Sequence, residues 1–124
     1  MALAEVCDAL VVIVPGGAET AGLIDAKVIE ALGPQSILVN VVRGSVVDEA
    51  ALIAALSTGK PGAAGLAVFE YEPQVPQALI ELQNKVLLPH VGSATEVTRR
   101  AMGDRVLDSL DAWFSGGKVP DQVT

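Results

Sequence analysis

Cysteine and aromatic residues are scarce in this 124-residue sequence. Cys7 is the only cysteine, which excludes an internal disulfide and makes a reducing cytoplasm the expected location. Aromatic residues account for only 3% of the chain, whereas hydrophobic residues of all kinds account for 51%. The core must therefore be built from Val, Leu, Ile and Ala, as is typical of buried parallel strands and their covering helices. The length suits one domain with one core.

Positive charge is also scarce. Lys and Arg number 8 against 15 Asp and Glu, which gives a formal net charge of −7. This balance argues against nucleic acid or a membrane surface as a partner, but one local arginine can still bind a small anion. No apolar run is long enough to span a bilayer, and no basic, apolar leader opens the sequence. We expect no transmembrane helix, no signal peptide and no metal site.

Short apolar runs alternate with helical patterns along the chain. Asp25 and Asp48 are candidate N-caps of two short helices, and Ser93 or Thr95 can cap a long last helix that ends near Phe114. This alternation predicts an α/β fold, a half-Rossmann unit of two or three layers with flanking helices and about four parallel strands. The expected strands are Ala9–Val14, Ile37–Val39, Ala63–Phe69 and Val86–Leu88. The first is predicted to be buried on both faces of the sheet, and the third to be tightly packed on both.

The predicted sheet leaves surfaces that need a cover. Right-handed crossovers place the first two helices on one face, so the last helix or a partner must cover the other. The apolar edge of Ala9–Val14 invites pairing with another chain, and a homodimer through this edge or through the uncovered face is expected. An apolar stripe on the last helix, expected to be core or interface, consists of Ala101, Met102, Val106, Leu110, Trp113 and Phe114.

Three ionisable side chains, Arg43, Glu72 and His90, follow three different strands. The carboxyl ends of parallel strands meet at one edge of a sheet, where ligands bind. Singly, each has an ordinary explanation: a solvated surface arginine, an acidic loop and a turn histidine. Gly44 follows Arg43 and is free to take a positive φ.

Together, these three side chains predict a catalytic site. A guanidinium can grip a carboxylate with two hydrogen bonds, and Arg43 is placed to do so. His90 is the only histidine, and a carboxylate such as Glu72 beside it would favour the imidazolium and fix the ring. This set suits the reduction of a 2-oxo acid, in which a nicotinamide supplies hydride and the histidine supplies a proton.

The stretches around these residues form an ordered set: Val14-Pro15 with Glu19–Ile24, Leu38–Glu49, Ala64–Pro73 and Leu88–Thr95. The set resembles the carboxyl-terminal part of the D-isomer-specific 2-hydroxyacid dehydrogenases, close to their glyoxylate/hydroxypyruvate reductase branch. The resemblance implies NAD or NADP as cofactor and a small 2-oxo acid as substrate. It implies that Arg43 binds the substrate, that His90 is the acid/base and that Glu72 is its partner. The cofactor-binding positions that it implies are Pro15, Val41, Arg43, Ala67, His90, Gly92 and Ser93.

Several departures from the family pattern stand out. Ala67 occupies the place of an Asp that contacts the nicotinamide carboxamide in the family, and Val42 replaces a smaller residue. The Gly-x-Gly-x-x-Gly turn, the acidic residue for the adenosine ribose and a separate substrate domain are not found in the sequence. We therefore expect residues 1–124 to form a single partial NAD(P)-binding domain, a fragment that is inactive alone. The alternatives are a non-catalytic folded half-domain or self-associating scaffold, and a nucleotide-sensing regulator, which nothing in the sequence specifically supports.

Overall fold

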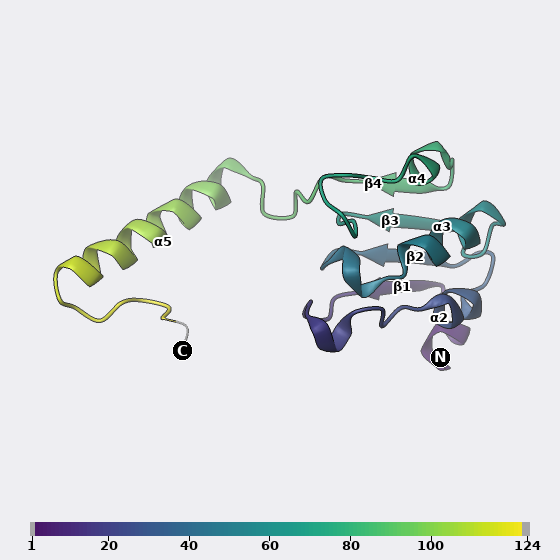
Figure 1. Ribbon diagram of the computed structural model, residues 1–124, viewed down its shortest axis with the longest axis horizontal. Coiled ribbons are helices and arrows are strands. Elements are labelled where there is room, and N and C mark those ends of the chain that lie inside the picture. Colours follow the sequence, from purple (N-terminus) through teal and green to yellow (C-terminus); the bar gives the residue numbers. More distant parts are fainter. Residues whose placement is uncertain (1, 123–124) are drawn as a thin grey trace. The chain divides into compact units, whose positions relative to one another are not determined.

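The computed structural model describes residues 2–122. Two compact units divide the chain, one through His90 and one from Val91 onward. Within residues 2–122, no helix is both long enough and apolar enough to cross a membrane. The elements of the first unit, shown in Figure 1, are α1 (Ala2–Val6), β1 (Ala9–Val12), η1 (Ala18–Thr20), α2 (Ala26–Ala31), β2 (Ile37–Asn40), η2 (Gly44–Val46), α3 (Glu49–Ser57), β3 (Ala63–Leu66), α4 (Gln77–Glu81) and β4 (Lys85–Leu87).

The first unit is built on a four-stranded sheet in the order β1-β2-β3-β4, with every neighbouring pair parallel. Leu38 of β2 is in register with Leu10 of β1 and Ala64 of β3. The predicted α/β half-Rossmann unit of four parallel strands with flanking helices is confirmed. Because the strands are parallel, their carboxyl ends all lie at one edge of the sheet.

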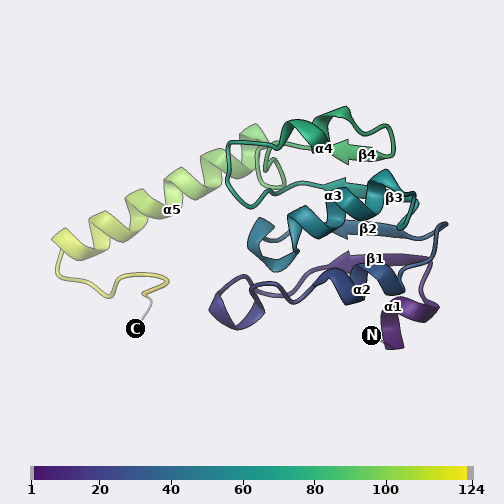
Figure 2. The same cartoon turned by 45° about the vertical axis from the view of Figure 1, so that its right-hand side comes forward.

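The helices α2 and α3 lie on the same side of this sheet, as the views in Figures 1 and 2 agree. On that side Leu38 is fully buried, whereas its neighbour Ile37 points the other way and is 43% exposed. The same alternation runs through the other strands, because successive side chains point to opposite faces. The core between sheet and helices includes Val12, Ile29, Leu32, Leu38, Leu52, Leu56, Ala64, Leu66 and Leu79.

Two predictions about the strands are wrong. β1 ends at Val12 and β3 at Leu66, earlier than expected, and neither is buried on both faces. Val11, on the face away from α2 and α3, is 51% exposed, and the side chain of Val86 on β4 is exposed too. An apolar run has the same sequence whether one or both faces of a strand are covered. The first unit therefore has two layers.

Side-chain caps begin the helices at the expected places. Asp25 accepts a hydrogen bond from the backbone N–H of Val28 at 2.9 Å, and Asp48 accepts one from Ala51 at 2.9 Å. These caps satisfy N–H groups that have no partner within their helices, and both predictions are confirmed. The Asp48 cap fixes where α3 starts, and so it limits the turn that carries Arg43 to the residues between Asn40 and Asp48.

The second unit contains α5 (Glu96–Phe114), which Thr95 caps through a 3.1 Å hydrogen bond from the Thr98 N–H. Arg105 of this helix pairs with Asp121. Within the second unit, the apolar stripe that includes Val106, Leu110 and Trp113 is exposed. Helical spacing shows that a stripe exists but not which element covers it. Its role as core or interface stays a prediction.

Candidate active site

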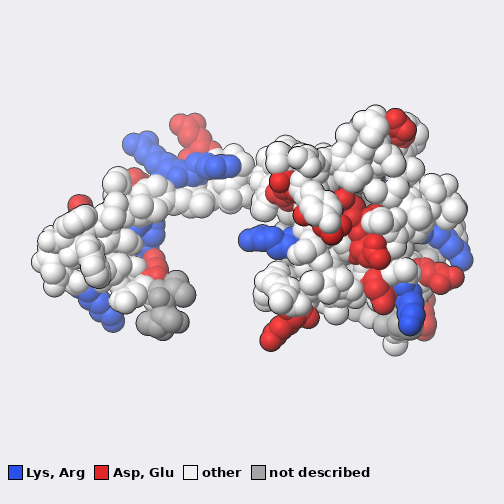
Figure 3. All heavy atoms as spheres, in the orientation of Figure 1, with Lys and Arg blue, Asp and Glu red and all other residues white. Residues whose placement is uncertain are grey.

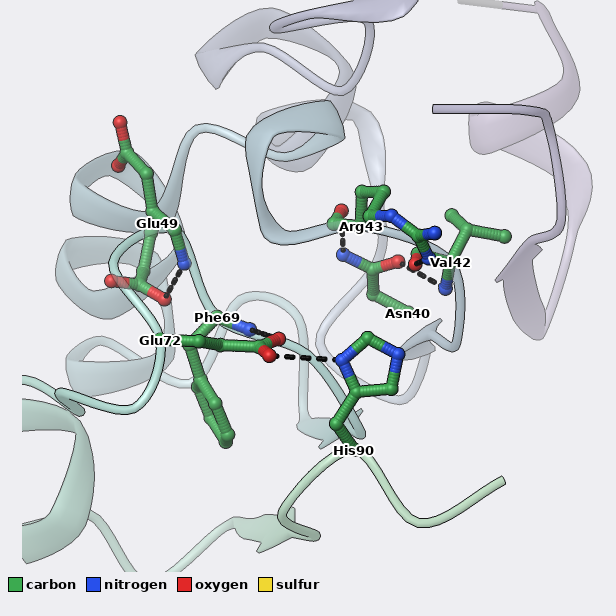
Figure 4. A network of polar contacts seen from close by, with 8 residues as sticks. Asn40, Val42, Arg43, Glu49, Phe69, Glu72 and His90 are labelled. Carbon is green, nitrogen blue, oxygen red and sulfur yellow. Dashed lines mark hydrogen bonds and ion pairs between the residues drawn. The ribbon is translucent and has the colours of Figure 1, made fainter. Parts of the chain in front are cut away.

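The carboxyl edge of the sheet brings together the three ionisable residues that the sequence singles out. Arg43 follows β2, Glu72 lies in the turn after β3, and His90 comes just after β4. All three belong to the first unit. Figure 4 shows the Glu72 carboxylate pointing at the His90 ring, with Arg43 on the neighbouring turn. The topology of the sheet therefore produces the predicted cluster, although the roles of its members stay predictions.

Glu72 and His90 make direct contact, with Oε2 of Glu72 2.9 Å from Nδ1 of His90. The other carboxylate oxygen, Oε1, accepts a hydrogen bond from the backbone N–H of Phe69 at 3.1 Å. The bond to His90 is the main cause that lowers the pKa of Glu72, followed by the Phe69 bond, and the charge of Arg43 contributes less. With Nδ1 engaged by Glu72, Nε2 is the ring nitrogen left to face a ligand.

The backbone of His90 has an uncommon conformation. Its φ is 51°, in the left-handed region that costs a residue with a side chain about 1–2 kcal/mol. Its N–H donates to the carbonyl oxygens of Ala67 at 2.9 Å and Leu88 at 3.0 Å. The segment after β3 therefore anchors the histidine. Backbone strain of this kind concentrates at functional sites, where the surrounding structure holds it.

The turn that carries Arg43 is organised by Asn40, a buried residue at the end of β2. Its Nδ2 donates to the Arg43 carbonyl oxygen at 2.9 Å, and its Oδ1 accepts from the Val42 N–H at 3.2 Å. Nη1 of Arg43 donates to the Val42 carbonyl oxygen at 2.6 Å. A Cβ on Gly16 would lie 2.3 Å from Cγ of Arg43, so the turn after β1 lies against the arginine stem.

The remaining predicted cofactor positions are divided between the two units. Pro15 and Val41 are exposed after β1 and β2, and Ala67 is half-buried directly after β3, so all three follow strands at the same edge. Gly92 and Ser93 are in the second unit, and their predicted role stays a prediction. Across residues 2–122, no group of three His, Cys, Asp or Glu side chains is placed to hold a metal ion.

Sequence reasoning assigned no role to Asn40 or Glu49, and of Gly44 it noted only the freedom to take a positive φ. A polar residue at the end of an apolar strand was the available signal for Asn40, whereas Glu49 resembles an ordinary acidic residue in a first helical turn. Gly44 does not take a positive φ. It is needed because a Cβ there would lie 2.0 Å from the carbonyl carbon of Phe69. The turn after β3 packs directly on the Arg43 turn at this point.

Comparisons with a family model and with known proteins match the chain to one family of enzymes. The family model described as "D-isomer specific 2-hydroxyacid dehydrogenase, NAD binding domain" matches residues 1–92. The chain is 53% identical to hydroxyphenylpyruvate reductase of Plectranthus scutellarioides over 92% of its length and 36% of that protein. It is 51% identical to glyoxylate/hydroxypyruvate reductase A of Arabidopsis thaliana, again over 92% of this chain and 36% of that protein. The chain thus spans roughly a third of the length of these relatives.

Solved structures agree with these sequence matches. The NADPH-dependent glyoxylate/hydroxypyruvate reductase of Sinorhizobium meliloti, in complex with NADP and malonate, superimposes with a TM-score of 0.92. The match has 54% sequence identity and covers 99% of this chain and 39% of that chain. The 2-hydroxyacid dehydrogenase of Ketogulonicigenium vulgare Y25 gives a TM-score of 0.93 at 43% identity, over 99% of this chain and 39% of that one.

Proposed function

Since the chain belongs to the D-isomer-specific 2-hydroxyacid dehydrogenase family and matches its NAD-binding domain, we propose that it serves the NAD(P)H-dependent reduction of a small 2-oxo acid. The substrate is of the glyoxylate or hydroxypyruvate type, and the product is the corresponding 2-hydroxy acid, as the D-isomer where that acid is chiral. The contact between Glu72 and His90 at the carboxyl edge, 2.9 Å long, is the observation that carries this proposal. The names of the relatives supply the substrate class.

In this mechanism each of the three residues has one task. Arg43 binds the substrate carboxylate, for which its planar guanidinium offers paired donors. Nε2 of His90 donates a proton to the carbonyl oxygen as negative charge develops there. Glu72 stabilises the imidazolium before the transfer and keeps the ring oriented afterward. The proton from His90 and one hydride convert the 2-oxo acid into the 2-hydroxy acid.

The carboxyl edge also fits the nicotinamide end of the cofactor. When bound, NAD(P)H supplies the hydride to the carbonyl carbon. Val41, which is 50% exposed, and the exposed Pro15 present apolar side chains at this edge, where an uncharged ring can pack. Ala67 adds no polar side chain for the carboxamide. We propose that residues 1–124 act as one partial NAD(P)-binding domain and that this chain by itself turns over slowly or not at all.

A second candidate function is a self-associating scaffold without catalysis. The observation that favours it is the uncovered face of the sheet, where Val11, Ile37 and Val86 are exposed. Apolar residues of this kind on neighbouring strands form a surface that another protein chain can cover. The two candidates differ in whether Arg43 and His90 respond to a 2-oxo acid.

Binding of glyoxylate to the purified chain separates these candidates. His90 is the only histidine, so its ring gives one set of imidazole signals in an NMR spectrum. We expect glyoxylate to shift these signals saturably in the wild-type chain and in Lys27→Gln, which removes an exposed cation from α2. In Arg43→Gln, binding should be at least tenfold weaker, because the paired donors for the carboxylate are lost. Equal binding by Arg43→Gln, or none by the wild type, would contradict the proposed site.

A further inference from the structure

Glu49 is a buried acid outside the cluster formed by Arg43, Glu72 and His90. It is the first residue of α3 and only 7% exposed, whereas most acidic residues at helix starts remain in water. Its Oε2 accepts a hydrogen bond at 3.2 Å from the backbone N–H of Glu70, in the turn after β3. Burial raises the pKa of Glu49, an effect that this hydrogen bond partly offsets and the nearby charge of Glu70 reinforces. Burying a carboxylate costs free energy. An acid at the start of a helix interacts favourably with the helix dipole while it is exposed to water, so the dipole does not explain why Glu49 is buried.

The peptide group that Glu49 holds also lies close to the backbone of Gly44. A Cβ on Gly44 would lie 2.0 Å from the carbonyl carbon of Phe69 and 2.3 Å from the nitrogen of Glu70. The Phe69–Glu70 peptide therefore contacts both the backbone of Gly44 and the carboxylate of Glu49. The first residue of η2 and the first residue of α3 together fix the position of the turn after β3.

The same turn sets the position of Glu72. The Phe69 N–H donates to Oε1 of Glu72 at 3.1 Å, and Oε2 of Glu72 meets Nδ1 of His90 at 2.9 Å. A chain of contacts thus runs from Glu49 to the Glu70 N–H, through the backbone of Phe69 to the Phe69 N–H, and on to Glu72 and His90. Figure 4 shows Glu49 and Glu72 held by backbone N–H groups of this one turn.

We propose that Glu49 is a positioning residue, which fixes the Phe69–Glu70 peptide and with it the adjoining Phe69 N–H that holds the Glu72 carboxylate against His90. Its importance for the reaction rests on the proposed function, but its effect on the Glu72–His90 contact does not. Two variants separate the effect of the length of the Glu49 side chain (its reach) from the effect of its charge. Glu49→Gln keeps an acceptor oxygen at the same distance along the side chain, and Glu49→Asp keeps the charge but withdraws the carboxylate by one methylene.

The readout is the pair of ¹⁵N chemical shifts of the His90 ring, which report which ring nitrogen carries a proton and how it is hydrogen-bonded. Glu72→Gln provides the reference for a broken carboxylate–imidazole contact. Glu30→Ala, which removes an exposed carboxylate from α2, is the matched control and should leave the ring signals unchanged. Circular dichroism shows that each variant is folded before its ring signals are compared.

We expect the ring shifts of Glu49→Asp to move from the wild-type values toward those of Glu72→Gln, and those of Glu49→Gln to stay close to the wild type. Any other pattern from the two folded variants overturns the proposal. A change in Glu49→Gln with none in Glu49→Asp would assign the effect to charge instead of reach. The experiment needs neither cofactor nor turnover, so failure of the wild type to bind glyoxylate would overturn the proposed function and leave this result standing.

Discussion

Glu72 contacts His90 directly, and this contact affects the pKa of its carboxyl group. Its hydrogen bond to His90 is the first cause of a pKa below the ordinary value of 4.5. A carboxyl whose pKa is lower in the folded state contributes stability that is fully present above its unfolded pKa. That contribution is lost as the pH falls through the folded-state pKa.

Glu72→Gln should therefore flatten the acid side of the stability profile. We expect the free energy of unfolding of the wild type to fall more steeply than that of Glu72→Gln as the pH drops below 4.5. Urea denaturation at a series of pH values, followed by circular dichroism, measures both profiles. Parallel profiles for the two chains would show that the Glu72–His90 contact does not stabilise the fold.

At the scale of elements, η2 packs closely against the turn after β3 at Gly44. A methyl group at Gly44 has no room, because the atoms that it meets are the backbone atoms of Phe69 and Glu70. We expect Gly44→Ala to lower the free energy of unfolding by about 1–3 kcal/mol or more. In Gly65→Ala, the new methyl group meets only Val39, at 3.8 Å, so this strand variant should lose no stability. Urea denaturation of the two variants checks the difference, and equal losses would contradict a close contact at Gly44.

Some features of the helices and strands could be predicted from the sequence, and others could not. The caps at Asp25 and Asp48 follow from local chemistry, and the meeting of Glu72 with His90 follows from the parallel order of the strands. The burial of Glu49 could not be predicted, because no local pattern shows that the turn after β3 packs on the start of α3. Nor could the open face of β1 be predicted, since an apolar run does not reveal how many layers cover it.

At the scale of the whole molecule, net charge and exposed apolar surface have opposite effects on self-association. Acidic side chains outnumber basic ones on the face of the first unit drawn in Figure 3, in keeping with a net charge of −7. This charge favours separate molecules in solution, whereas the exposed apolar residues on β1 and β2 favour association. Salt screens the repulsion between charges and leaves the apolar attraction in place.

The uncovered face and the edge of β1 are the surfaces through which we propose that two copies associate. Light scattering of the wild type should give a mass above that of one chain, and association should strengthen with salt. The double variant Val11→Lys with Ile37→Lys puts two charges on exposed positions of this face and should be monomeric. Val97→Lys, at an exposed position on α5, is the control and should associate as the wild type does. A monomeric wild type would contradict association, and an associating double variant would exclude this face.

A titration of NADPH and NADH into the purified chain, followed by nicotinamide fluorescence, tests the claim that the carboxyl edge around Arg43, Val41 and His90 forms the nicotinamide end of a cofactor site. We expect a saturable change in fluorescence for the wild type, and a weaker affinity when Val41→Asp places a charge where the ring would pack. A wild-type chain that is folded by circular dichroism but gives no saturable change would contradict the claim.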